Sequence, residues 1–371
     1  VDREGSLIQW TTDEAGAGNG RWSPCGSYIS FVSGREGKTP QIYLLPTNGG
    51  EAKKLTNLKE GSIGAVKWSP DGKYIAFTYR ETHPDFTQEA AKKREEKNAS
   101  LPPMIIEEPW YRLDGDSYFL DARYKLYIIE AKGGEPKLLH ECKAFDHFDF
   151  DWSPTSLEIV VTEPVSKQPL YKPDNDQLVR LDLDGNRLIV EGATPGAKSV
   201  VRWSPDGKTL AYLGTDSPND WGAKNIRVFT CPADGGPSTD LSAGTDYCMM
   251  VGAIADTKDS YGEGILEWSP DSKALYVTVG WHGEVQIGFI DVSKPGVELL
   301  TKGQHYLACG NVSKDGESIA CVFGDPVRPV EVALYDLSKN ADTPDVLTNF
   351  NGPLLNELKL SRPEEFWIES E

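Results

Sequence analysis

The feature that most constrains this chain of 371 residues is a five-residue unit, WSPDG, that recurs along it. In chain order the copies are WSPCG at Trp22, WSPDG at Trp68, WSPTS at Trp152, WSPDG at Trp203, WSPDS at Trp268 and a degenerate VSKDG at Val312. Ser, Pro, Asp and Gly fill the four positions of a type I turn, because proline presets φ at the second position and glycine accepts a positive φ at the fourth. Each copy, called a marker below, therefore predicts the turn of a β-hairpin.

The strands around the markers predict stacked sheets. GAVKW before the second marker and YIAFTY after it are apolar on both faces, which is typical of strands buried on both sides. The marker Trp is large enough to act as a wedge between neighbouring sheets. Each marker is followed by an alternating strand, a Gly-rich or Asp-rich turn and a short outer strand, as in QIYLLPTNGGEAKKLT. Each repeat thus supplies four antiparallel strands.

Four strands in about 40 to 50 residues are the blade of a β-propeller, so we predict an all-β propeller with six full blades across residues 1–360. Two longer intervals between markers each indicate one blade with an insertion. SLIQW, residues 6–10, looks like the outer strand of an earlier blade whose other strands are absent. We therefore expect a seven-bladed parent. The alternative is a six-bladed ring in which this strand closes the last blade.

Composition excludes some partners. The formal net charge of -19 disfavours nucleic acid, because phosphate binding needs a basic face. No apolar run reaches the roughly 18 residues of a membrane span, so we expect no membrane partner. VDREGSLIQW lacks the apolar core of a signal peptide, and we expect a cytoplasmic protein. A signal removed upstream stays open, because the chain can begin inside a longer protein.

The six cysteines include no CxxC pair, which argues against a zinc site. Cys309 and Cys321 flank the last marker and could face each other across its hairpin. Free buried thiols are the favoured interpretation in a chain with so few cysteines for its length.

Propellers bind ligands through segments that depart from the repeat. The largest is the insertion at residues 81–121, in which residues 87–97 predict a solvated helix or, alternatively, a mobile loop. Its second part and the residues that follow carry aromatic and Arg side chains typical of a binding surface: Trp110, Tyr111, Arg112, Tyr118, Phe119 and Arg123. The alternative is a loop that packs the insertion on its own blade. In residues 242–264 a short apolar patch could meet another surface; it consists of Tyr247, Met249, Met250 and Val251. The alternative is a loop folded over blade edges. Residues 214–225, with Trp221, are interpreted as structural.

Little catalytic chemistry is visible. The chain has no G-x-S-x-G, no HExxH, no P-loop and no dinucleotide fingerprint. Asp149 and Asp151 alternate along a strand and share a face, with Asp146 and His147 nearby, so a cation is conceivable there. We expect neither a metal nor a cofactor.

Three segments carry a resemblance to a known family, and the second and third are more specific than the first. RWSPCGSYISFVSGREGKTPQIYLLPTNGGEAKKLT resembles a blade of the prolyl oligopeptidase-type serine peptidases, in particular their acylaminoacyl-peptidase branch. PWYRLDGDSYFLDARYKLYIIEAKGGEPKLL and the final LLNELKLSRPEEFWIESE are similar to the same branch. The markers alone are less specific, since TolB-like and other propellers share them. The resemblance covers essentially the whole chain but only one of the family's two domains.

The resemblance implies that residues 361–371 begin a linker to a C-terminal α/β-hydrolase domain that holds the nucleophile, acid and histidine. No residue here matches them, so this chain alone should be inactive. The propeller would gate the active site, admitting short peptides and excluding folded proteins, and a homo-oligomer stays open. We expect peptide contacts from Tyr111, Arg112 and Arg123. The alternatives are a non-enzymatic TolB-like interaction propeller and, more remotely, a propeller lyase or glycosidase.

Overall fold

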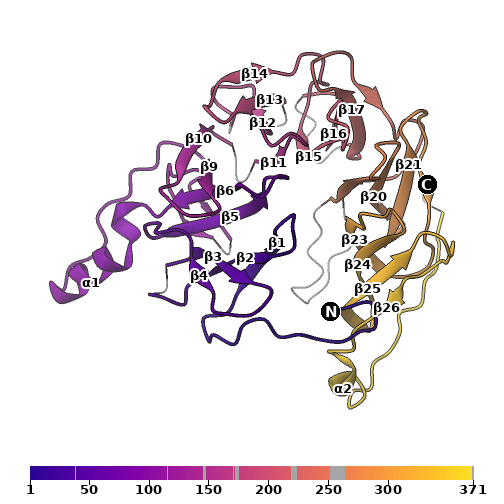
Figure 1. The fold of residues 1–371 in the computed structure, drawn as a ribbon, viewed down its shortest axis with the longest axis horizontal. Helices are drawn as coiled ribbons and strands as arrows, with labels where there is room; N and C mark the ends of the chain where they lie inside the picture. Colours follow the sequence, from indigo (N-terminus) through magenta and orange to yellow (C-terminus); the bar gives the residue numbers. More distant parts are fainter. Residues whose placement is uncertain are drawn as a thin grey trace.

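Six four-stranded antiparallel sheets surround a common axis in the computed structural model (Figure 1). The structure describes residues 1–37, 39–114, 116–144, 148–169, 171, 175–218, 224–250 and 264–369. Each sheet is built from strands that follow one another in the chain, with the first strand innermost. The predicted propeller with six full blades is confirmed.

The strand bounds of the six blades are as follows. Blade 1 contains β1 (Gly18–Trp22), β2 (Tyr28–Ser33), β3 (Gln41–Pro46) and β4 (Lys53–Lys54), and blade 2 contains β5 (Gly61–Trp68), β6 (Tyr74–Glu81), β9 (Lys125–Glu130) and β10 (Lys137–Glu141). Blade 3 contains β11 (Phe150–Trp152), β12 (Glu158–Pro164), β13 (Asp176–Asp182) and β14 (Arg187–Ile189), and blade 4 contains β15 (Lys198–Trp203), β16 (Thr209–Gly214), β17 (Arg227–Pro232) and β18 (Thr239–Asp240). Blade 5 contains β19 (Leu266–Trp268), β20 (Ala274–Trp281), β21 (Glu284–Asp291) and β22 (Glu298–Leu299), and blade 6 contains β23 (Tyr306–Val312), β24 (Ser318–Asp325), β25 (Arg328–Asp336) and β26 (Asp345–Val346).

The remaining elements are short. The insertion in blade 2 contains the 3-10 helix η1 (Pro84–Phe86), helix α1 (Gln88–Glu96) and the hairpin β7 (Arg112–Leu113) and β8 (Ser117–Tyr118). Helix α1 has no buried residue, which confirms the predicted solvated helix. Helix α2 (Gly352–Leu355) follows blade 6. Within the described ranges, no helix is long and apolar enough to cross a lipid bilayer.

The marker turns have the predicted geometry. In the second marker the Gly72 N–H donates to the Ser69 carbonyl at 2.9 Å, and Gly72 has φ of 72°. Serine replaces this glycine in blades 3 and 5, where Ser156 and Ser272 adopt φ of 62° and 61°. The Ser156 hydroxyl accepts the Asp71 N–H of the preceding blade at 2.9 Å, and the Ser272 hydroxyl of blade 5 accepts the Asp206 N–H of blade 4 at 3.0 Å. This bond between blades offsets the strain of a positive φ in a residue with a Cβ.

The marker Trp acts as the predicted wedge in most blades. Trp152, Trp203 and Trp268 are 4%, 7% and 8% exposed. The Trp152 indole N–H also donates to the carbonyl of Lys67 in the preceding blade at 3.2 Å. Trp22 is the exception, because it is 57% exposed.

A second polar contact recurs at the start of the third strand. The side-chain oxygens of Gln41 and Gln286 accept the hydroxyls of Thr56 and Thr301, each at 2.8 Å. Glu331 takes this place in blade 6, and its carboxylate also accepts two backbone N–H groups. The contact ties the third strand of each of these blades to the chain that leaves its outer strand.

Two further expectations have clear outcomes. Residues 6–10 form no strand, so the outer strand that SLIQW predicted is absent. The alternative in which it closes the last blade is wrong, because all four strands of blade 6 come from β23 to β26. An isolated strand has no backbone partners to hold it extended.

Cys309 and Cys321 are direct partners across β23 and β24, and both are free and buried, which confirms the favoured interpretation of free thiols.

Candidate functional site

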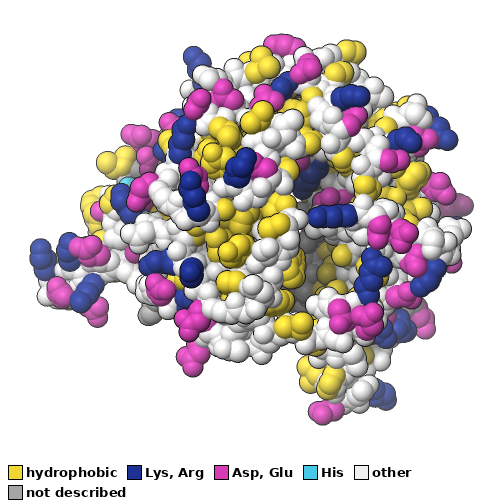
Figure 2. All heavy atoms as spheres, viewed as in Figure 1, with side chains coloured by type: hydrophobic (Ala, Val, Ile, Leu, Met, Phe, Trp, Pro, Cys, Tyr) yellow, Lys and Arg dark blue, Asp and Glu magenta, His cyan; other side chains and the backbone are white. Residues whose placement is uncertain are grey.

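The markers also determine which side chains approach the axis. Consecutive inner strands contact one another from β1 to β23. The residue before each marker points away from the marker's first side chain, because strand side chains alternate. These residues are Arg21, Lys67, Asp151, Arg202, Glu267 and Asn311, and all but the last are charged. The face in Figure 2 is hollowed near its middle, with basic and acidic side chains at the edge.

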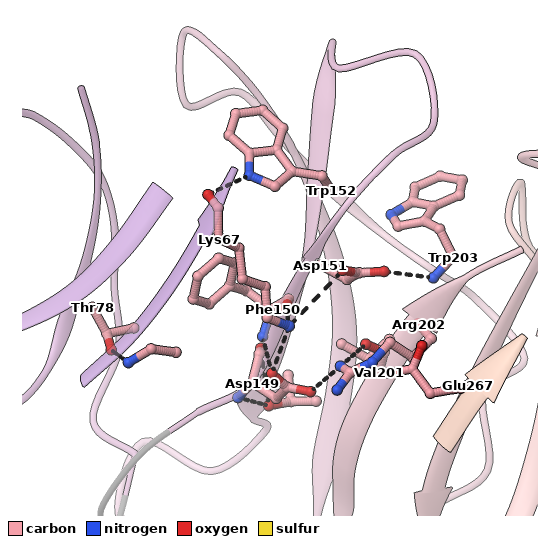
Figure 3. Close-up of polar contacts among 12 residues, drawn as sticks. Lys67, Thr78, Asp149, Phe150, Asp151, Trp152, Val201, Arg202, Trp203 and Glu267 are labelled. Atoms are coloured by element: carbon pink, nitrogen blue, oxygen red, sulfur yellow. Dashed lines mark hydrogen bonds and ion pairs between the residues drawn. The ribbon is translucent and has the colours of Figure 1, made fainter. Parts of the chain in front are cut away.

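Ion pairs join three blades at the axis, among Lys67, Asp149, Asp151 and Arg202, which we call the axial network (Figure 3). The Lys67 ammonium lies 3.3 Å from the Asp149 carboxylate and 3.9 Å from that of Asp151. The Arg202 guanidinium lies 2.8 Å from the second Asp149 oxygen. Each of the four side chains is 22% or 23% exposed, so the charges are partly desolvated yet reach water.

Burial and charge act against each other in this network. Burial alone would raise the pKa of Asp149, but Lys67 and Arg202 hold that pKa below its ordinary value. Burial prevails at Asp151 and raises its pKa. Burial also raises the pKa of Glu267, whose side chain accepts the Asn311 amide at 3.4 Å. The axis therefore combines firmly ionised groups with carboxylates that are easier to protonate.

The cation considered at Asp149 and Asp151 competes with these pairs. The ammonium of Lys67 and the guanidinium of Arg202 already contact the oxygens that would ligate it. Asp146 and His147 lie outside the described residues. Across the described ranges, no group of three His, Cys, Asp or Glu side chains is placed to hold a metal ion.

The long connections leave the ring on one face. In every blade the chain passes from the second to the third strand at the end opposite the marker turn, and the blade 2 insertion leaves there. The C-terminal segment reaches the same connections in the last two blades. Arg362 pairs with Asp325 at 3.0 Å, and the Trp367 ring lies 4.8 Å from the His282 ring. We call this face the loop face.

An aromatic ladder forms on the insertion. The Tyr111 ring stacks on Tyr118 with centroids 6.1 Å apart, and Tyr118 stacks on Phe86 at 6.2 Å. The Arg112 guanidinium lies over the Tyr118 ring at 5.7 Å, and its side chain is 54% exposed. The structure thus brings Tyr111 and Arg112 together and leaves the Arg112 guanidinium half-exposed, 4.0 Å from the Asp114 carboxylate.

Arg123 is placed differently. Its side chain is 9% exposed and pairs with Glu108 at 3.0 Å. It also donates to the carbonyls of Trp110 and Leu120 at 3.1 and 2.9 Å. The guanidinium therefore braces the insertion from inside. Peptide contact by Tyr111, Arg112 or Arg123 stays a prediction.

The second off-repeat segment is described only up to residue 250. Met249 is buried, whereas Met250 is 42% exposed. The Tyr247 ring meets the Trp281 ring edge-on at 5.0 Å. The segment therefore packs on blade 5, as a loop over blade edges would. Val251 and Trp221 lie outside the described residues.

Sequence reasoning found the acidic half of the axial network and missed its cations. Lys67 and Arg202 lie directly before a marker, as do Arg21 and Glu267. The signal was a charged residue at the same register of five repeats. The marker Trp fixes the register, so this position can be found without a structure.

No protein-family model matches the chain. A curated relative, the uncharacterized peptidase YuxL of Bacillus subtilis, is 27% identical over 370 residues, which cover 100% of this chain and 54% of the relative. Dipeptidyl-peptidase 5 of Porphyromonas gingivalis is 24% identical over 170 residues, or 45% of this chain and 22% of that protein.

Solved structures share the fold over nearly the whole chain. An acylaminoacyl peptidase in complex with Z-Gly-Gly-Phe-chloromethyl ketone matches with a TM-score of 0.70 and 17% identity, covering 96% of this chain and 48% of its own. Acylaminoacyl peptidase of Pyrococcus horikoshii matches with a TM-score of 0.69 and 18% identity, covering 96% of this chain and 48% of its own. The β-propeller domain of the Trilobed protease of Pyrococcus furiosus matches with a TM-score of 0.58 and 16% identity, covering 90% of this chain and 84% of its own. The resemblance found in the sequence is confirmed, and the chain spans about half the length of the first of these relatives.

Proposed function

We propose that this chain is the propeller part of a serine peptidase of the acylaminoacyl-peptidase type that hydrolyses short peptides. The observation that carries the proposal is the fold match over 96% of this chain to 48% of an acylaminoacyl peptidase. The proposed catalytic part is an α/β-hydrolase domain that follows residues 361–371. The C-terminal segment lies on the loop face, so that domain would dock there.

The axial network supports a gating role. Partly exposed ions keep the axis hydrated, and they offer an extended peptide both donors and acceptors for its backbone. In this proposal the inner strands, which contact one another in sequence from β1 to β23, line a passage that an extended peptide can enter and a folded protein cannot. Such a passage would select peptides by size and by lack of structure.

The aromatic ladder supports peptide contact on the loop face. Aromatic rings with an exposed guanidinium offer apolar area and a charged donor at one place. In this proposal Arg112 pairs with a carboxylate or carbonyl of the peptide, and Tyr111 packs against its side chains. Arg123 holds the ladder in position.

The proposal is tested with the natural polypeptide that contains residues 1–371 and whatever follows them. We expect it to cleave acylated peptides of a few residues and to leave intact a folded protein that contains the same peptide sequences. Residues 1–371 alone should cleave neither. Absence of hydrolysis by the natural polypeptide across acylated and free peptides would favour an interaction propeller instead.

The contact residue has its own test. Arg112→Ala should lower kcat/KM about tenfold for peptides that present a carboxylate, the loss expected for one charge-assisted hydrogen bond. Lys92→Ala is the matched control, because Lys92 is an exposed cation on the same insertion. Equal kcat/KM for Arg112→Ala and the parent on all peptides would remove Arg112 from the site.

A further inference from the structure

Two neighbouring interfaces between blades are closed at their outer edge by the same kind of ion pair. Lys137 of β10 lies 3.3 Å from the carboxylate of Asp184, in the turn between the third and fourth strands of blade 3, and donates to the carbonyl just before it at 2.7 Å. Arg180 of blade 3 lies 2.6 Å from the carboxylate of Asp234, in the same turn of blade 4, and donates to the carbonyl just before it at 3.1 Å. A cation of one blade thus meets a carboxylate of the next.

The interface between blades 1 and 2 lacks this ion pair. Lys53 of β4 is the repeat equivalent of Lys137, because each stands three residues after the second glycine of a Gly-Gly pair. The turn of blade 2 carries Lys132 as the second residue after β9, where blade 3 has Asp184 after β13. Lys132 pairs with Glu130 of its own turn at 2.8 Å, and among the described residues no carboxylate pairs with Lys53. Like charges therefore stand where the next interfaces have opposite ones.

A cleft of about 480 Å³, which we call the edge cleft, lies at this interface on the side of the marker turns. Lys53, Lys54 and Lys132 line it, and Lys54 pairs with Glu36 at 3.0 Å, so the ammonium of Lys53 is the one without a carboxylate. The walls are largely apolar and come from both blades: Tyr28, Leu44, Pro46, Leu55, Trp68 and Ala131. Apolar walls with a few polar groups are typical of small-molecule sites of this volume.

We propose that the edge cleft binds a small carboxylate that carries an apolar or aromatic body. The carboxylate takes the place of the absent Asp and accepts hydrogen bonds from the Lys53 ammonium. The apolar walls cover the body and remove it from water. A neutral apolar molecule would instead bury the ammonium without a partner, and an inorganic anion would leave the walls wet. The proposal does not depend on the peptidase function.

Cys25 is a native reporter of this site, because its exposed thiol lines the edge cleft. Hydrogen bonds from Ser27 and Ser23 lower the pKa of that thiol to about 7, so iodoacetamide alkylates it at neutral pH. The measurement is the alkylation rate of Cys25, resolved by peptide mass spectrometry, in the natural polypeptide that contains residues 1–371. N-acetylphenylalanine at about ten times its dissociation constant should slow this alkylation about tenfold, whereas its neutral amide and inorganic phosphate should not.

The matched control for accessibility is Thr155→Cys. Thr155 holds the place of Cys25 in the marker of blade 3 and is exposed, but the interface beside it is closed by Arg180 and Asp234. The thiol of Thr155→Cys should be alkylated at the same rate with and without N-acetylphenylalanine. Equal slowing at both positions would assign the effect to the reagent and overturn the proposal.

Three variants test the charges. Lys132→Asp restores the carboxylate found in blades 3 and 4, which should pair with Lys53, close the edge cleft and abolish the protection of Cys25. Lys53→Ala should weaken binding of N-acetylphenylalanine about tenfold or more, the loss expected for one hydrogen bond to a charged group. Lys137→Ala, the equivalent whose ammonium is already paired, should leave binding unchanged.

Four further results would overturn the proposal. The first is no protection of Cys25 by N-acetylphenylalanine at about 20 mM, well above the millimolar range of weak ligands. Equal protection by the acid and its amide would show an apolar pocket that does not recognise a carboxylate. Equal protection by phosphate would show attraction of any anion. Undiminished protection in Lys132→Asp, a variant that removes no packing, would show that the cations of the edge cleft do not hold the ligand.

Discussion

Trp152 and Trp22 occupy the same position of the same repeat in different surroundings, so their substitution isolates the effect of the wedge. A Trp side chain buries up to about 200 Å², which at about 25 cal/mol/Å² stabilises the folded state by about 5 kcal/mol. Trp152 is 4% exposed and retains nearly all of this, whereas Trp22 is 57% exposed and retains about 2 kcal/mol. Trp152→Ala should therefore lower the free energy of unfolding by about 3 kcal/mol more than Trp22→Ala.

The assay is urea unfolding of residues 1–371, followed by far-UV circular dichroism and compared at the first transition. The indole bond from Trp152 to the Lys67 carbonyl adds to the expected difference, because its loss leaves a partly buried acceptor without its donor. Equal losses for the two variants would show that the marker Trp does not stabilise the ring by packing on the preceding blade. A larger loss at Trp22 would refute the reasoning outright.

Three other predictions follow from single contacts. Burial opposes the ionisation of Glu331, yet hydrogen-bond donors that include Thr348 and Asn351 hold its pKa below the ordinary value. The ionised carboxylate should therefore stabilise the fold fully above about pH 4.3, and this stabilisation should be lost as pH falls through the lowered pKa. The free energy of unfolding of Glu331→Gln should accordingly depend less on pH than that of the parent between about pH 2 and pH 5. Ser156→Ala should lower the free energy of unfolding by about 1 kcal/mol more than Ser156→Gly does, because both lose the bond to the Asp71 N–H but only alanine keeps the strain of a positive φ. Thermal melts in which Ser156→Gly is the less stable variant would contradict this. Hydrogen bonds from Ser27 and Ser23 lower the pKa of the Cys25 thiol to about 7, so its iodoacetamide labelling should rise with pH through about 7, and an unshifted profile near 9 would contradict this.

The architecture was predictable because the marker turn encodes it locally. Proline and glycine fix the backbone of the turn, and the Trp fixes which face of the strand is buried, so blade boundaries follow from the sequence alone. The exception at residues 6–10 has a physical cause. A strand needs partners, and hydrophobic alternation cannot report whether the partner strands lie within the same stretch of chain.

The candidate site was less predictable. Asp149 and Asp151 were recognised as a pair on one face, but their partners Lys67 and Arg202 lie in other blades and are close only once the ring has formed. The aromatic and Arg residues of the insertion were evident from the sequence. In the structure, however, Arg123 is buried and Arg112 is exposed. No local sequence pattern distinguishes a guanidinium that holds a loop together from one that lies on its surface.

Among the residues that the structure describes, each blade is closed within a continuous stretch of chain, and the last blade takes no strand from the first. In residues 1–371 the molecule is therefore topologically a bent linear array with two ends, even though its outline is round. Such arrays lose their terminal units first, because a terminal unit has one neighbour and an interior unit has two. For residues 1–371 by themselves we therefore expect blades 1 and 6 to yield to proteolysis and to pulling before the interior blades do.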